Sequence, residues 1–273
     1  MPPPRGLKAL VKRTATARLT KGKIKCFVAV NDTSTRPKKL QGITKKIEKR
    51  LYSRDSMLPI IARQSDERPG GHWRGPNGGR LRGKKVDAQL TRIANTGGSK
   101  AGAHVYRLTK LVLEALRQQG LELLCAQRSV CVRRLGLATA ADLVCFSPAT
   151  SSVVILELKC GFPSGRKAAA LSSNGQPQAM QAPLERAADC VLHRHFAQLA
   201  CTYEMSKSPA LQNGLQKMGL CSEIDAVLMY ACDKGVETFR LPDWWKKRAP
   251  RMLERIGGGP RPSFRNPQTT SKQ

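Results

Sequence analysis

The feature that most constrains this chain is a pair of apolar runs joined by a short polar turn, "ADLVCFSPATSSVVILELKCG", at residues 141–161. Each run is short and rich in valine, isoleucine and leucine, which predicts the two strands of a β-hairpin. The same runs carry Asp142, Glu157 and Lys159, although an unpaired charge buried in an apolar core costs several kcal/mol. We therefore expect the three side chains to meet at one site where their charges are compensated.

The register of this hairpin places the charges. Side chains alternate along a strand, so Glu157 and Lys159 emerge on the same face. If "SPATSS" forms the turn, cross-strand partners have residue numbers that sum to about 299, and Asp142 lies opposite Glu157. Cross-strand partners have Cβ atoms roughly 4.5–5.5 Å apart, so the two carboxylates are expected to hold one divalent cation.

The chemistry expected at this point is hydrolytic. Mg²⁺ takes oxygen ligands and keeps several waters, so two carboxylates and the backbone carbonyl of Leu158 make an adequate set of protein ligands. A lysine beside a bound cation orients a water molecule, lowers its pKa, or neutralises charge that develops on a phosphate. We assign this role to Lys159.

The acid on one strand followed by "ELK" on the next resembles the PD-(D/E)xK nuclease superfamily. Three further stretches resemble its branch that includes RecB, lambda exonuclease and the viral alkaline nucleases: "GLATAAD" before the first acid, the glycine in "ELKCG", and "FAQLACTYEM", with Gln198 and Tyr203. That branch has glutamine and tyrosine four residues apart, whereas the spacing here is five. The resemblance covers residues from about 80 to 240. It implies a restriction-endonuclease-like fold, a role for Gln198 in positioning the water or Lys159, and DNA contact by Tyr203.

Members of this branch often carry one more metal ligand upstream. The strand "CAQRSVCV" has Gln127 at the matching position, and the helix "RGKKVDAQL" has Asp87 where a histidine is usual. His104, in the following helix, is a third candidate, and the sequence leaves the choice open.

A glycine-bounded loop follows the predicted site and contains Arg166 and Lys167. We expect these two residues either to bind a DNA phosphate or a 5′ end, or to be exposed without a role. His193 and His195, two apart on a predicted helix, are interpreted as ordinary polar positions.

The order of predicted elements is two helices, three or four strands, a long helix, two strands and a final helix. A meander followed by a helical crossover predicts an α/β fold with a mixed sheet and helices on both faces. We place this nuclease-like domain at residues 81–256, with its long helix from about Ala182 to Met205. Residues 1–80 are predicted to form a basic, largely flexible arm, with one local strand and a short helix near "ITKKIEKRLY", and residues 257–273 a disordered tail.

Charge indicates the partner. The chain of 273 residues has a formal net charge of +29, and residues 1–100 hold 25 Lys and Arg against 6 Asp and Glu. Such a surplus calls for a polyanion, so DNA is the expected partner. The clusters "RPKK" and "KKIEKR" suit a nuclear import signal or plain contact with the DNA backbone, and the acid-poor start also suits a mitochondrial presequence.

Two classes of protein are disfavoured. The apolar runs are shorter than the ~18 residues that a membrane span needs. The nine cysteines include no C-x-x-C pair, which argues against a zinc ribbon and for reduced, buried thiols.

These observations predict a DNA nuclease that depends on Mg²⁺, or alternatively Mn²⁺, and acts on linear duplex DNA or its ends. An exonuclease or end-processing role in recombination, repair or viral-type replication is the expected setting. The alternative is a non-catalytic nucleic-acid-binding protein that retains a nuclease-like fold.

Overall fold

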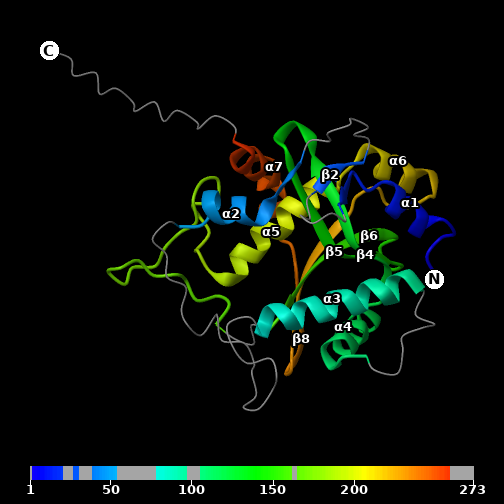
Figure 1. Ribbon diagram of the computed structural model, residues 1–273, viewed down its shortest axis with the longest axis horizontal. Helices are drawn as coiled ribbons and strands as arrows, with labels where there is room; N and C mark the ends of the chain where they lie inside the picture. Colours follow the sequence, from blue (N-terminus) through cyan, green and yellow to red (C-terminus); the bar gives the residue numbers. More distant parts are fainter. Residues whose placement is uncertain are drawn as a thin grey trace.

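The computed structural model describes residues 2–20, 27–30, 39–53, 78–96, 105–161 and 165–258. Figure 1 shows a central sheet with helices on both sides. The helices in the described residues are α1 (Leu7–Arg13), α2 (Ile43–Leu51), α3 (Gly78–Thr96), α4 (Arg107–Gln118), the short 3₁₀ helix η2 (Arg133–Leu135), α5 (Val191–Ser206), α6 (Pro209–Lys217) and α7 (Asp243–Gly257). The strands are β1 (Ala17–Leu19), β2 (Phe27–Ala29), β3 (Gln41–Gly42), β4 (Glu122–Val132), β5 (Leu137–Ser147), β6 (Ser152–Cys160), β7 (Asp225–Cys232) and β8 (Gly235–Arg240).

The main sheet is mixed, as predicted. β4, β5 and β6 form an antiparallel meander, and α5 and α6 then carry the chain to β7, which is parallel to β6. β8 returns antiparallel to β7, and the short β3 pairs parallel with the first residues of β5. β1 and β2 form a separate antiparallel pair. A parallel partner for β6 requires a crossover of this length, which the sequence supplies with two helices.

Two apolar layers enclose the sheet. On one face α3 and α4 pack their apolar stripes, with Val86 and Leu108, against Leu156 of β6. On the other face α1, α2, α5 and α7 form a larger core that includes Val153 and Ile155 of the same strand. The alternation along β6 therefore directs the next odd-numbered residues, Glu157 and Lys159, toward α5.

The prediction of a largely flexible arm over residues 1–80 is wrong for the described segments. α1 and α2 bury their apolar positions in the larger core: Leu7, Leu10, Val11, Ile43, Ile47 and Leu51. The short helix expected near "ITKKIEKRLY" is confirmed as α2. The basic composition obscured α1, because lysines and arginines occupy the exposed face of the helix while apolar residues recur at helical spacing. Residues 21–26, 31–38 and 54–77 lie outside the described residues, as do residues 259–273 of the predicted tail.

The long helix after the site is shorter than predicted. It begins at Val191 rather than near Ala182, and residues 165–190 form an irregular segment held by isolated bridges, among them Ala179 with Ala188. Pro183 lacks the N–H that a helix interior needs and disfavours helical geometry in the residue before it. Leu184 and Ala187 are nevertheless buried in the larger core, so the apolar spacing that suggested a helix reflects the packing of consecutive turns.

Arg128 of β4 joins α1 to the sheet. Its buried side chain donates from Nε to the Val11 carbonyl and from Nη2 to the Thr14 carbonyl, each over 3.0 Å. Burial lowers the pKa of Arg128. The carbonyls at the C-terminal end of α1 carry partial negative charge, and so they compensate this buried cation.

We expect Arg128→Ala to lower the free energy of unfolding by about 2–4 kcal/mol, because it removes two hydrogen bonds to a charged group and leaves buried carbonyls unpaired. Urea denaturation measures this loss. Arg133→Ala, which changes an exposed arginine at the end of the same strand, is the control and should stay within about 0.5 kcal/mol of the original protein. Equal stability of the two variants would contradict the role assigned to Arg128.

Candidate functional site

The hairpin register predicted from the sequence is confirmed. β5 and β6 pair Leu143 with Leu156 and Val144 with Ile155. The ladder between the two strands ends at the pair of Leu143 and Leu156. Beyond this pair, Oδ2 of Asp142 accepts a hydrogen bond from the backbone N–H of Leu158 over 2.9 Å. The N–H and C=O of one strand residue point to the same side, so the Leu158 carbonyl also points toward β5.

Glu157 lies at the centre of the site and is 1% exposed. Its Oε1 accepts a hydrogen bond from Lys159 Nζ over 2.6 Å and one from Gln198 Nε2 over 2.5 Å. Lys159 Nζ also donates to Gln198 Oε1 over 3.1 Å. The other carboxylate oxygen, Oε2, is buried near the Asp142 carboxyl and has no other partner, and the two acids can share a hydrogen bond only when one of them is protonated. The structure thus brings Asp142, Glu157, Lys159 and Gln198 together, from β5, β6 and α5.

The ionisable side chains of the site strongly influence one another's pKa values. Burial and the neighbouring Asp142 raise the pKa of Glu157 to about 8, despite the opposing effect of Lys159. Burial also raises the pKa of Asp142. Burial disfavours the charged form of Lys159, but Glu157 and Asp142 outweigh it and raise the pKa of this lysine. The site therefore favours the charged form of Lys159 and disfavours the simultaneous ionisation of Asp142 and Glu157.

Two of the three upstream candidates reach Asp142. Asp87 projects from α3, and burial together with nearby Asp142 raises its pKa to about 6. Gln127 donates from Nε2 to Asp142 Oδ1 over 3.4 Å, a long contact. Its backbone φ of 53° is uncommon for a residue other than glycine and places a bend in β4 beside the site. His104 lies outside the described residues.

The donor set fits a hard divalent cation. Asp142 and Glu157 supply carboxylates, Leu158 supplies a carbonyl, and the unpartnered Oε2 of Glu157 is the kind of buried acceptor that a cation satisfies. Within the described ranges, no group of three or more His, Cys, Asp or Glu residues is arranged to hold a metal ion. These two observations are compatible, because Mg²⁺ is commonly bound by one or two carboxylates with water in the remaining positions.

Two of the three predicted DNA-contact residues, Arg166 and Tyr203, make contacts with other side chains of the protein. Arg166 forms an ion pair with Glu237 and stacks over the Tyr230 ring at 4.6 Å, so its guanidinium is already engaged. Lys167 is exposed and lines a shallow pocket with Arg166. Tyr203 is 7% exposed beneath Lys207, whose Nζ is 4.2 Å from the ring centroid. A spacing of five on an α-helix turns Tyr203 roughly 140° away from Gln198, which explains this placement.

The sequence analysis missed His195 and Tyr230. Tyr230 pairs with Lys159 in the β6–β7 ladder, and its hydroxyl lies 2.7 Å from His195 Nδ1. Burial and the charge of Lys159 lower the pKa of His195, which keeps its ring neutral. The spacing of three between His195 and Gln198 on one helix was the available signal, because such residues share a face.

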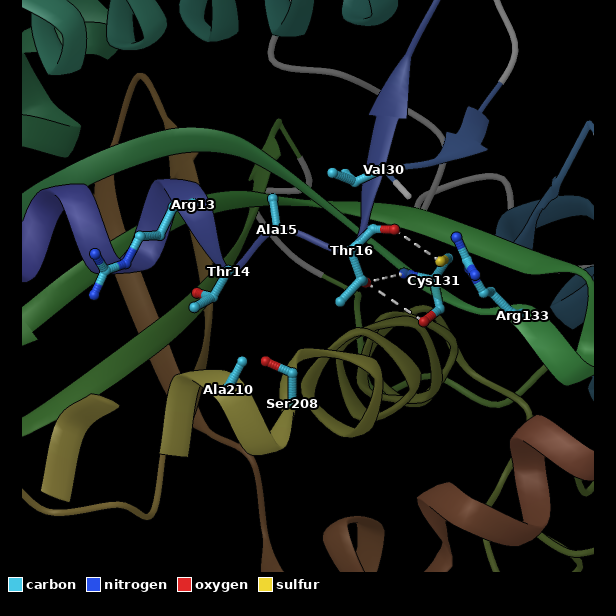
Figure 2. A pocket seen from close by; sticks show the side chains of 9 residues that line it. All are labelled: Arg13, Thr14, Ala15, Thr16, Val30, Cys131, Arg133, Ser208 and Ala210. Carbon is cyan, nitrogen blue, oxygen red and sulfur yellow. Dashed lines mark hydrogen bonds between the residues drawn. The ribbon is translucent and has the colours of Figure 1, made fainter. Parts of the chain in front are cut away.

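A separate pocket of about 480 Å³ lies between α1, β4 and α6. Figure 2 shows Thr16 hydrogen-bonded to Cys131 in its wall, with Arg13 and Arg133 on opposite sides of the view. None of the acidic residues of the site lines this pocket. It therefore belongs to the packing of the N-terminal segment against β4 and not to the carboxylate site.

No protein-family model matches the chain, and no curated protein matches it in sequence. In the part of the chain that the structure describes, no helix combines the length and apolar character needed to cross a membrane. The eight cysteines in these segments are all free thiols, as predicted.

Glu157 should make stability depend on pH when metal is removed with a chelator. Its pKa is higher in the folded chain, at about 8, than the ordinary 4.5, so the folded state holds an extra proton between these values. Stability therefore falls as pH rises through this window. We expect Glu157→Gln to reduce the decrease in the free energy of unfolding between pH 5 and pH 8, measured by urea denaturation. The control Glu185→Gln, at an exposed position, should leave this decrease unchanged. An undiminished slope in Glu157→Gln would refute the assigned protonation.

A divalent cation should stabilise the folded chain by supplying the missing partner of Glu157. We expect Mg²⁺ or Mn²⁺ to raise Tm, by an amount equivalent to about 2.7 kcal/mol at 100 times Kd. The increase should be larger at pH 8 than at pH 6, because binding requires ionised carboxylates. Asp142→Asn should abolish the increase, and equal increases in both proteins would place the cation elsewhere.

Proposed function

We propose that this protein is a metal-dependent nuclease that hydrolyses phosphodiester bonds in DNA. The observation that carries the proposal is the environment of Glu157. Lys159 and Gln198 hold one of its oxygens, while the other is buried without a partner and lies near the Asp142 carboxyl. Paired carboxylates beside a fixed lysine are suited to hydrolysis at a phosphate.

Asp142, Glu157 and the Leu158 carbonyl would hold Mg²⁺ or Mn²⁺. Such an ion, when bound, would polarise a phosphoryl oxygen and lower the pKa of a coordinated water. The protein's own contribution is to hold these oxygens in place. Asp142 is fixed by the Leu158 N–H and Glu157 by Lys159 and Gln198.

Lys159 acts in this proposal as a cation. Its raised pKa keeps the ammonium charged, so it donates hydrogen bonds to a water or a phosphate oxygen and does not accept a proton. Gln198 is a positioning residue, because its amide donates to Glu157 and accepts from Lys159. Loss of Gln198 would remove one hydrogen bond from each of these side chains, which would remain paired only with each other.

The charge of the chain supports nucleic acid as the substrate. A net charge of +29 favours a polyanion, and α2 and α3, which flank the described sheet, expose Lys45, Lys49, Lys84 and Lys85. Resemblance to the PD-(D/E)xK superfamily favours DNA, since Asp142, Glu157, Lys159 and Gln198 are the residues on which that resemblance depends. Among the described residues, no third His, Cys, Asp or Glu side chain is placed to join Asp142 and Glu157 on a metal ion, which supports the second candidate, a DNA-binding protein that does not cleave.

Purified protein mixed with end-labelled linear duplex DNA should produce shortened product only when Mg²⁺ or Mn²⁺ is present. We expect Lys159→Ala to lower the cleavage rate by about 100-fold or more, because it removes a charge directed at the reacting phosphate. Asp142→Asn, which keeps the shape of the side chain, should have a comparable effect. Product length against time on linear and circular DNA separates exonuclease from endonuclease action.

The matched control is Lys110→Ala, which removes an exposed lysine from α4. It should cleave at the original rate, and all variants should retain cooperative thermal unfolding. Cleavage that survives chelation or Lys159→Ala would contradict the proposal. A gel shift at low salt without any metal-dependent product would support the non-catalytic alternative.

A further inference from the structure

Arg82 of α3 is a buried cation whose hydrogen-bonding capacity the fold leaves partly unsatisfied. The residue is 3% exposed, and its Nε and Nη2 atoms are buried with no hydrogen-bond acceptor. No ion pair involves Arg82 within the described ranges. A desolvated guanidinium without an acceptor costs several kcal/mol. Arg128, the other buried arginine of the sheet region, at least donates to two carbonyls at the end of α1.

The guanidinium of Arg82 lies at the end of β6, next to the carboxylate site. Arg82 Nη2 is 3.9 Å from the position that a Cβ atom on Gly161 would occupy. Gly161 has a φ of +99° and follows Lys159 by two residues, and its N–H is already bonded to Ala231. This glycine therefore places backbone, and no side chain, beside a guanidinium that is enclosed in the folded chain.

The surroundings of Arg82 carry charges of both signs and include the thiol of Cys160, whose pKa the charge of Arg82 lowers against the larger effect of burial. On the same helix, Lys85 lies over the Tyr106 ring at 4.9 Å, and the charge of Arg82 lowers the pKa of Tyr106 against the larger effect of burial. Asp87, five residues further along α3, reaches toward Asp142 and Lys159. The helix thus carries an arginine beside one end of the site and a carboxyl beside its centre.

We infer that Arg82 binds a phosphate of the substrate strand adjacent to the phosphate that is hydrolysed. The planar guanidinium donates two parallel N–H bonds and matches phosphate geometry better than an ammonium does. The inference rests on the proposed function for the identity of the ligand. The bound group is either an internal phosphodiester or a terminal phosphate, since both present the same oxygens.

The experiment measures binding apart from cleavage, in a Glu157→Gln background with Ca²⁺, by fluorescence polarisation of a labelled oligonucleotide duplex. Adding Arg82→Met should weaken Kd about tenfold and lower the slope of log Kd against log salt by about 1. Its Tm should stay unchanged or rise, because an apolar side chain replaces an uncompensated buried charge. Arg82→Lys should recover only part of the affinity, since lysine restores the positive charge but not the two parallel N–H donors of the guanidinium.

Arg92→Met is the matched control, because Arg92 is an exposed arginine ten residues, or about 15 Å, further along the same helix. It should change neither Kd nor the salt slope by a comparable amount. A lower Tm with unchanged Kd in Arg82→Met would overturn the inference and make Arg82 a structural residue. An effect seen only with a 5′-phosphorylated duplex assigns a terminal phosphate, and an effect that persists with a 5′-hydroxyl duplex assigns an internal one.

The two proposals can fail separately. If the unaltered protein binds DNA through Arg82 but yields no metal-dependent product, nuclease activity is refuted and the phosphate site stands. If the protein cleaves DNA and Arg82→Met leaves both KM and kcat unchanged, the phosphate site is refuted and nuclease activity stands.

Discussion

The antiparallel register between β5 and β6 is the constraint on which the candidate site depends. A slip of one residue would turn Glu157 and Lys159 from the α5 face to the apolar layer beneath α3 and α4. Burial opposes that slip, because Leu156 is fully enclosed on one face and Ile155 on the other. Each such side chain contributes roughly 1.5–3 kcal/mol when buried. The apolar residues of the hairpin therefore hold the polar ones in place.

Three unfavourable features of the fold lie together at the end of the sheet that carries the site, while others, such as the unpartnered Nε of Arg255 and the positive φ of Ser151, lie elsewhere. Glu157 is buried with an unpartnered oxygen, Arg82 is buried with unpartnered nitrogens, and Gln127 has a left-handed backbone. Each of these features destabilises the folded chain, and the surrounding structure maintains them only because the two apolar layers supply a surplus. Such clustering is characteristic of sites where ligand binding supplies the missing interactions. The proposed cation and phosphate would satisfy Glu157 and Arg82 respectively.

Prediction from the sequence succeeded where apolar and polar residues alternate regularly within one element. Alternation in β5 and β6 and the position of the turn were enough to pair Leu143 with Leu156, and the order of elements was enough to predict a mixed sheet. It failed over residues 182–190, where a helix was predicted and buried Leu184 belongs to an irregular segment. It also failed for α1, because the basic composition of the first residues hid an apolar face. Periodicity reports which residues are buried but not which backbone conformation buries them.

The sequence alone determined that Asp142, Glu157 and Lys159 share one face of a hairpin, because strand alternation and a short turn leave little freedom. Tertiary structure decided which other groups reach them. Gln198 comes from a helix about forty residues later, Asp87 from a helix on the other side of the sheet, and Arg82 lies beside Gly161. These approaches depend on how the helices cross the sheet and on which of their residues face its end. No local pattern encodes such distances, since they result from the packing of side chains far apart in the chain.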